Sequence, residues 1–166
     1  MSLEKYHQVI GKKLENIREA KDDYNLSYGS NMNLMQIRER CGNSWRRVKE
    51  WTMCKAIKVV FDRPSSILNG GVANLVEDPA SKVFGVLFEI NSSKCLQLCE
   101  VYLNVYDRKE LFVFVPDLGR ELKAVAYIRT EPESIAKTSE GYLNTIIEGA
   151  KENCLPEDWI ALLEKL

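Results

Sequence analysis

Apolar residues along the chain fall into short blocks that favour strands, separated by stretches with the spacing of helices. The strand blocks are rich in Val, Ile, Leu, Phe and Tyr, and the helical stretches follow residues that can cap a helix. Because strands and helices do not alternate regularly, the pattern predicts an α+β fold rather than a doubly wound sheet. The predicted strands begin near Tyr24 and cover 56–61, 72–76, 82–90, 111–115 and 122–128, and the predicted helices begin near Asn31 and cover 94–102, 142–150 and 156–166.

Two stretches between these strands have the composition of turns. The acidic and proline-containing stretch 77–80 predicts a tight connection between the strands on either side of it. Residues 116–119, with the sequence Pro-Asp-Leu-Gly, predict a second turn between the last two strands. Both pairs of strands are therefore expected to form local antiparallel hairpins.

The first 23 residues form a separate unit in the pattern. Their aliphatic residues fall close to one face of a helix that is otherwise rich in Lys and Glu, namely Leu3, Ile10, Leu14 and Ile17. Such a helix can dock on its own domain, which we favour, or on a partner, which could be a second copy of the chain. We therefore expect an N-terminal amphipathic helical extension over 1–23 and a single domain over 24–166.

Length and charge restrict the function further. A chain of 166 residues with 45% hydrophobic residues is large enough to bury the core of one domain. Its 23 Lys and Arg against 24 Asp and Glu leave no global field that would attract a nucleic acid or an acidic membrane. No apolar signal region and no run of 18 apolar residues is present, so we expect a cytoplasmic protein without a membrane partner.

Histidine and cysteine chemistry is sparse. The single histidine, His7, lies in the N-terminal extension, which argues against Ser-His-Asp and Cys-His catalysis and against most zinc sites. The cysteines are odd in number and have no CxxC spacing, so we expect five free thiols, at Cys41, Cys54, Cys95, Cys99 and Cys154.

A basic and aromatic segment follows the first predicted helix. Residues 41–55 interleave Trp45 and Trp51 with arginine and lysine, a composition that can stack on a nucleic acid and neutralise it. The segment is short and its charge is compensated elsewhere in the chain. We favour a solvated loop or helix face with buried tryptophans over a nucleic-acid site.

The most informative stretch for chemistry runs from Tyr24 to Met32. Gly29 can adopt a positive φ and allow close approach to the backbone, and Ser30 or Asn31 can cap the helix that follows. Amide groups at such a helix start, together with the helix dipole, favour a carboxylate or a developing oxyanion. An ordinary turn between a strand and a helix has the same composition, so both interpretations remain open from the residues alone.

Four motifs extend this stretch into a family pattern. They are Tyr28-Gly29-Ser30-Asn31-Met32, Gly70-Gly71-Val72-Ala73-Asn74-Leu75, Val83-Phe84-Gly85-Val86-Leu87-Phe88, and Gly149-Ala150 with Leu155-Pro156. Their order and spacing resemble the gamma-glutamylcyclotransferase-like proteins, often called the AIG2-like family, over residues 24–166. The resemblance implies a small mixed-sheet, barrel-like core with surrounding helices, in which the Tyr-Gly-Ser-Asn loop lines a cavity at the mouth of the barrel.

The chemistry that the resemblance implies is intramolecular aminolysis. The α-amine of a γ-glutamyl group attacks its own γ-carbonyl and releases 5-oxoproline with a free amine or amino acid, without a metal or an organic cofactor. An ammonium is not a nucleophile, so one group must remove its proton and return a proton to the leaving nitrogen, which a single glutamate can do. The loop of Tyr28, Gly29, Ser30 and Asn31 would hold the substrate carboxylate or the oxyanion.

The position of that glutamate is where the sequence departs from the family. The family has Leu-Asp-x-x-Glu-Gly at the end of the helix after the Gly-Val-Leu strand. Aligned without a gap from Gly85, Leu98 matches the leucine and Tyr102 stands in place of the glutamate, which implies an inactive member that binds a small carboxylate or a protein partner. With a helix two residues shorter, Leu96 matches the leucine and Glu100 becomes the catalytic residue. The glycine after the glutamate is absent in both registers, and both remain open.

Overall fold

The computed structural model describes residues 24–48, 51–65, 70–90, 107–129 and 136–166. The predicted N-terminal helical extension over 1–23 and the predicted helix over 94–102 lie outside these residues. The domain boundary after residue 23, the dimer contact suggested for the extension, and the register of Glu100 and Tyr102 therefore stay predictions.

Strands dominate the described part of the chain. They are β1 (Tyr24–Ser27), β2 (Trp45–Arg47), β3 (Thr52–Ser65), β4 (Gly70–Ile90), β5 (Asp107–Val115) and β6 (Arg120–Ile128). The α-helices are α2 (Leu34–Cys41), α4 (Glu140–Glu152) and α5 (Glu157–Glu164), and single 3₁₀ turns form η1 (Ser30–Met32) and η2 (Pro116–Leu118).

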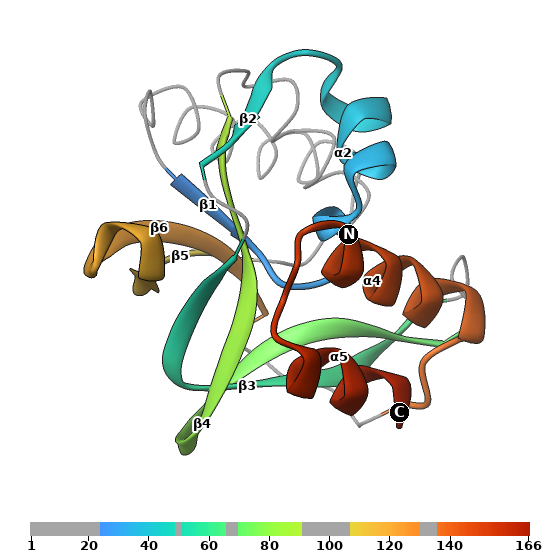
Figure 1. The fold of residues 1–166 in the computed structure, drawn as a ribbon. Coiled ribbons are helices and arrows are strands. Elements are labelled where there is room, and N and C mark those ends of the chain that lie inside the picture. The colour runs from blue at the N-terminus through green and yellow to red at the C-terminus, as the bar shows by residue number, and fades with distance from the viewer. Residues whose placement is uncertain (1–23, 49–50, 66–69, 91–106, 130–135) are drawn as a thin grey trace, which may run out of the picture.

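The strands close into a small barrel with mixed pairing. The order is β1-β6-β5-β3-β4, and β1 also pairs with β4, which closes the ring of five strands. The β1–β6 pair is parallel and the other pairs are antiparallel, with β2 added outside the ring on β4. In Figure 1 α4 and α5 lie together on one side of the barrel, and α2 lies above α4 in this view. The α+β prediction and the barrel-like core implied by the resemblance are confirmed.

One predicted hairpin is correct and the other is wrong. β5 and β6 pair antiparallel across η2, where Gly119 has φ +61°. The stretch around Asp78 does turn locally, because its carboxylate accepts the Ala80 amide and the Ser81 hydroxyl. However, the segments on either side of it belong to one long strand, β4, and both pair with β3 rather than with each other.

Among the described strand pairs of the barrel, β3 and β5 have the shortest ladder of paired residues. Only Met53 and Phe114 are paired between these strands. Side chains extend the contact, since the Thr52 hydroxyl donates to the Phe114 carbonyl at 2.6 Å and the Cys54 thiol lies 3.4 Å from the Phe112 carbonyl. The buried hydroxyl of Thr52 thus replaces part of a strand ladder.

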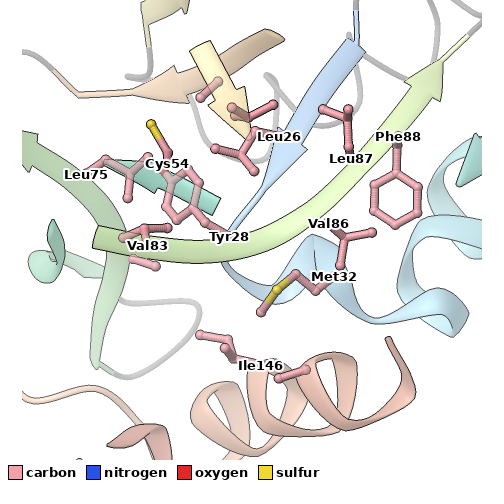
Figure 2. Packing of buried hydrophobic residues seen from close by; sticks show 14 of the residues in the cluster. Leu26, Tyr28, Met32, Cys54, Leu75, Val83, Val86, Leu87, Phe88 and Ile146 are labelled. Atoms are coloured by element: carbon pink, nitrogen blue, oxygen red, sulfur yellow. The ribbon is translucent and has the colours of Figure 1, made fainter. Parts of the chain in front are cut away.

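The two ends of β4, residues 71–75 and 85–88, are buried continuously, which explains why residues on both faces of the strand there are mostly apolar or small, whereas its middle around Asp78 is exposed. Leu87 pairs with Leu26 of β1 and lies toward the barrel interior. Figure 2 shows Val86 on the opposite face, with Met32 between β4 and Ile146 of α4. Leu87, Val86, Met32 and Ile146 are all at most 1% exposed. The turn η1 is therefore packed between the barrel and α4.

The basic and aromatic segment is packed against the protein. Trp45 lies edge-on to Phe88, with ring centroids 5.6 Å apart, and Arg46 forms an ion pair with Glu89. Arg47 donates to the side chain of Asn153 at 2.8 Å. The tryptophan side chains are partly buried as expected, but Trp45 begins a short strand rather than a loop or a helix.

The prediction of five free thiols is wrong, and among the described residues it fails at Cys41. Cys54 and Cys154 are free thiols as expected, whereas Cys41 at the end of α2 is disulfide-bonded. Its partner lies outside the described residues, and the absence of a CxxC motif could not indicate a bond between distant cysteines. Within the described ranges, no helix is both long and apolar enough to cross a membrane.

Candidate functional site

The signature stretch forms the end of β1, the single turn η1 and the start of α2. Gly29 has φ −117° and ψ −143°, so the expected positive φ at this glycine is wrong. The cap of α2 is Asn33, whose side chain accepts the Gln36 amide at 3.0 Å, rather than Ser30 or Asn31. The physical reason is that η1 separates the strand from the helix and moves the cap further along the chain.

Two amides at the start of α2 already have acceptors within the protein. The Leu34 amide donates to the Glu152 carboxylate at 3.0 Å, and the Gln36 amide is taken by the Asn33 cap. Within η1, the Met32 amide donates to the Gly29 carbonyl at 3.1 Å. The expected anion site is therefore confined to the loop that precedes the helix.

Side chains from α2 hold the polar groups of this loop. Gln36 donates to the Ser30 hydroxyl at 2.8 Å and to the Asn31 Oδ1 at 3.1 Å. Arg40 donates to the same Asn31 oxygen. Because two donors bind Oδ1, the orientation of the Asn31 side-chain amide is fixed, and its Nδ2 must point away from Gln36 and Arg40. The Arg40 guanidinium also places a positive charge beside the loop.

The loop lines a pocket at the end of β1. Its cavity volume is about 60 Å³, more than the roughly 10–15 Å³ needed by one water, so a small polar group can enter. The four residues predicted to bind substrate all line it, which brings Tyr28, Gly29, Ser30 and Asn31 to one place. The other described lining residues are Asn25, Leu26, Ser27, Val72, Ala73, Tyr127 and Tyr142.

Two tyrosine side chains line the pocket, Tyr28 from the loop and Tyr142 from α4. The Tyr28 hydroxyl donates to the Tyr127 carbonyl at 2.7 Å, which ties the loop to the end of β6. The Tyr142 hydroxyl, on the first turns of α4, accepts the Ala73 amide at 3.2 Å. Burial raises the pKa of Tyr142, and the Ala73 amide, Ser30 and the Arg40 charge oppose this more weakly. The phenol of Tyr142 therefore keeps its proton at neutral pH and can act as a hydrogen-bond donor.

Close packing of α4 fixes the position of the loop. A Cβ atom on Gly149 would lie 2.6 Å from the Asn33 amide nitrogen and 2.7 Å from the Met32 carbonyl carbon. The buried side chain of Asn153 donates to the Met32 carbonyl at 2.8 Å and to the Gly149 carbonyl at 2.7 Å. Gly149 allows the backbone of α4 to contact the backbone at Met32 and Asn33, and the hydrogen bonds of Asn153 stabilise this contact. Both interactions hold the turn that follows the pocket loop.

The sequence predicted the pocket residues of the Tyr28–Asn31 loop but not those that β6 and α4 contribute. Tyr127 lies 99 positions after its partner Tyr28, and no local signal connects them. Tyr142 was visible only as an apolar position of a predicted helix, although a buried tyrosine needs a partner for its hydroxyl. Glu100 and Tyr102 lie outside the described residues. The described lining residues include amides, hydroxyls and phenols but no carboxylate.

Comparison with known proteins shows what this chain is similar to. The model of the AIG2-like family matches residues 82–163. Gamma-glutamylcyclotransferase of Mus musculus is 35% identical over 94 residues, which are 55% of this chain and 49% of that protein. The Homo sapiens protein of the same name is 33% identical over 100 residues, 58% of this chain and 52% of its own. The matched part of the chain thus spans about half the length of these two relatives.

A longer alignment and solved structures extend the likeness. Gamma-glutamylcyclotransferase of Bos taurus is 29% identical over 141 residues, 81% of this chain and 73% of that protein. A structure of a gamma-glutamyl cyclotransferase has a TM-score of 0.78 with 27% identity, over 87% of this chain and 88% of that one. A Bacillus subtilis protein, YkqA, is similar in fold at a TM-score of 0.72 and 20% identity, over 97% of this chain and 57% of its own.

The signature loop, the five-stranded barrel and these matches agree with one another. The Tyr28–Asn31 loop lies at a pocket of the barrel, as the resemblance implied. The family match begins within β4 and ends within α5, so it includes the helix that backs the loop. The chain belongs to the AIG2-like family of gamma-glutamylcyclotransferase-like proteins.

Proposed function

We propose that this protein is a γ-glutamyl cyclotransferase that releases 5-oxoproline from a small γ-glutamyl amine or amino acid. The observation that carries the proposal is the pocket at the Tyr28–Asn31 loop, in a chain whose relatives bear the name of that activity. The site is rich in hydrogen-bond donors and lies beside the Arg40 charge, which suits the carboxylate of a glutamyl group.

Each part of the loop has a role in this proposal. Amide and hydroxyl donors at Gly29, Ser30 and Asn31 hold the α-carboxylate or the oxyanion that develops on the γ-carbonyl. The protonated phenol of Tyr142 adds a donor next to Ser30. These groups position and stabilise charge, but the amides and phenols cannot remove a proton from the substrate ammonium at neutral pH.

The acid and base role falls to Glu100 in the proposal. No described lining residue is a carboxylate. The segment 91–106, which contains Glu100, rejoins the described chain at β5, where Asp107 pairs with Ile128 and Arg108 pairs with Tyr127 of the pocket. Glu100 would take the proton from the ammonium and return one to the leaving nitrogen, so that neither step needs another group.

The proposal is tested by measuring 5-oxoproline released from a panel of γ-glutamyl amines, amino acids and dipeptides. Turnover of at least one class above the rate of spontaneous cyclisation is the expected result. If no compound in the panel reacts, while 5-oxoproline or a γ-glutamyl compound binds, the protein is an inactive member of the family that binds a small carboxylate. That outcome corresponds to Tyr102 in the catalytic position.

The reaction as proposed needs no metal and no organic cofactor, because the new C–N bond forms and the old one breaks within a single substrate and the protein exchanges only protons with it. Dialysis against a chelator should leave the turnover number unchanged within twofold. Loss of turnover on dialysis, with recovery on adding back a divalent cation, would contradict this part of the proposal.

Removing the hydroxyl of Tyr142 should impair the site. In Tyr142→Phe the Ala73 amide loses its acceptor and Ser30 loses its neighbour, so kcat/KM should fall by about tenfold to a hundredfold, the equivalent of one hydrogen bond to a charged group. The matched control is Tyr24→Phe, because Tyr24 belongs to β1 but does not line the pocket. Equal losses of kcat/KM in both variants would show that Tyr142 has no special role.

A further inference from the structure

The C-terminal end of β6 borders the pocket and extends beyond its parallel partner. β1 pairs with β6 only through Tyr24 opposite Ala124 and Asn25 opposite Val125. β6 continues to Ile128, with β5 along its other edge. Because β1 turns away into the pocket loop, the last residues of β6 depend on groups other than a β1 backbone along that edge.

Two side chains form hydrogen bonds with the backbone along this edge of β6. The Tyr28 hydroxyl donates to the Tyr127 carbonyl at 2.7 Å. Two residues further on, Asn74 of β4 binds both backbone groups of Arg129: its Oδ1 accepts the Arg129 amide at 2.8 Å, and its Nδ2 donates to the Arg129 carbonyl at 3.2 Å. One donor and one acceptor on a single residue reproduce what a neighbouring strand would supply.

The orientation of the Asn74 amide is fixed by a buried carboxylate. Its Nδ2 also donates to Asp62 Oδ2 of β3 at 2.9 Å. A carboxylate can only accept here, so Nδ2 must face Asp62 and Oδ1 must face the Arg129 amide. Asn74 and Asp62 are 0% and 1% exposed, which keeps water from replacing either contact. The pair therefore specifies one geometry for the end of β6.

We propose that Asn74 is a positioning residue for the pocket. Its side chain binds the Arg129 backbone as a neighbouring strand would, and this fixes the end of β6. The Tyr127 carbonyl is thereby fixed as well, and this carbonyl sets the direction of the Tyr28 hydroxyl. Asn74 follows Ala73, whose amide binds Tyr142, so the same short part of β4 anchors both tyrosines. The consequence for turnover rests on the proposed function, whereas the consequence for Tyr28 does not.

The test replaces Asn74 by leucine, which is of similar size but has no amide. Hydrogen exchange of the Arg129 amide should become roughly three to ten times faster than in the wild type, because its acceptor is lost. The ring ¹³Cζ resonance of Tyr28 should shift, since its hydroxyl loses a fixed acceptor. The milder variant Asp62→Asn replaces one carboxylate oxygen by an amide nitrogen, so that residue 62 no longer dictates which end of the Asn74 amide faces it, and it should change both signals in the same direction.

The matched control is Thr52→Val. Thr52 is also a fully buried polar residue whose side chain binds a strand carbonyl, but it acts at the β3–β5 seam away from the pocket. It should lower the melting temperature without altering the Tyr28 resonance or the Arg129 exchange rate. The positioning role is overturned if Asn74→Leu and Asp62→Asn leave the Tyr28 resonance and the Arg129 exchange rate unchanged. It is also overturned if Thr52→Val changes these two signals as much as the other variants do.

Turnover gives an independent readout. With an active wild type, Asn74→Leu should raise KM for a γ-glutamyl substrate more than tenfold relative to Thr52→Val at equal folded fraction, because Tyr28 lies in the binding loop. A change in kcat and KM that matches the Thr52→Val control would contradict the proposal. If the wild type has no turnover, the proposed function fails, and the Tyr28 and Arg129 signals still decide the role of Asn74.

Discussion

Replacing Glu100 by glutamine should lower the release of 5-oxoproline by about two to four orders of magnitude, the usual contribution of a positioned general acid and base. Glutamine keeps the size and hydrogen-bonding reach of the side chain but cannot accept the ammonium proton at neutral pH. The rate of 5-oxoproline formation from the best γ-glutamyl substrate is the measurement. The melting temperature should hardly change if Glu100 is at the surface, where substitutions usually stay within about 0.5 kcal/mol.

The neighbouring Tyr102 provides the control for register. Tyr102→Phe removes only a hydroxyl and should leave turnover within a few fold if Glu100 is the catalytic group. The opposite register makes the opposite prediction: the wild type is inactive and Tyr102→Glu gains activity. A gain in Tyr102→Glu would overturn the assignment of Glu100, because only a position that faces the loop can supply the base.

The change Gly149→Ala should destabilise the protein and damage the pocket loop together. The new Cβ would lie 2.6 Å and 2.7 Å from backbone atoms of Asn33 and Met32, which cannot rotate away as a side chain could. Overpacking of this kind costs about 1–3 kcal/mol and occasionally more. Either α4 or η1 must shift, so we expect a loss of unfolding free energy in a denaturant titration together with a higher KM for the substrate.

The same helix contains a matched control for this glycine. A Cβ on Gly141 would have no atom within 4 Å, and alanine favours helix by up to about 1 kcal/mol over glycine. Gly141→Ala should therefore leave stability unchanged or raise it, with unchanged KM. If both alanine variants were equally stable, the close approach of α4 to the turn would not be a constraint on the fold.

Local signals in the sequence predicted local structure well. Residues 116–119 gave the correct β5–β6 hairpin because a proline and a left-handed glycine define that turn without help from the rest of the chain. The stretch 77–80 has equally good turn chemistry, and Asp78 does fold it, but the flanking segments pair with β3. Turn composition shows where a chain bends, whereas pairing depends on which distant edge is available.

The candidate site follows the same division. The family signature located Tyr28, Gly29, Ser30 and Asn31, and the structure brings them to one pocket. The predicted cap at Ser30 or Asn31 and the predicted positive φ at Gly29 were wrong because a single 3₁₀ turn, which moves the cap to Asn33, is too short to have a hydrophobic period. The remaining walls come from β4, β6 and α4, whose approach depends on tertiary packing.

The position of β1 between β4 and β6 also has a consequence for the order of folding. β1 occurs at the start of the described chain, yet one of its neighbours begins at Arg120, and the helix that backs its loop begins at Glu140. Contacts between such distant segments form only after large loops have closed. The entropy cost of loop closure is therefore met before the contacts can stabilise the chain, which slows folding. On a ribosome, β4 can join β1 early, while β6 and α4 emerge later. The pocket loop therefore acquires its final surroundings only when most of the chain has been synthesised.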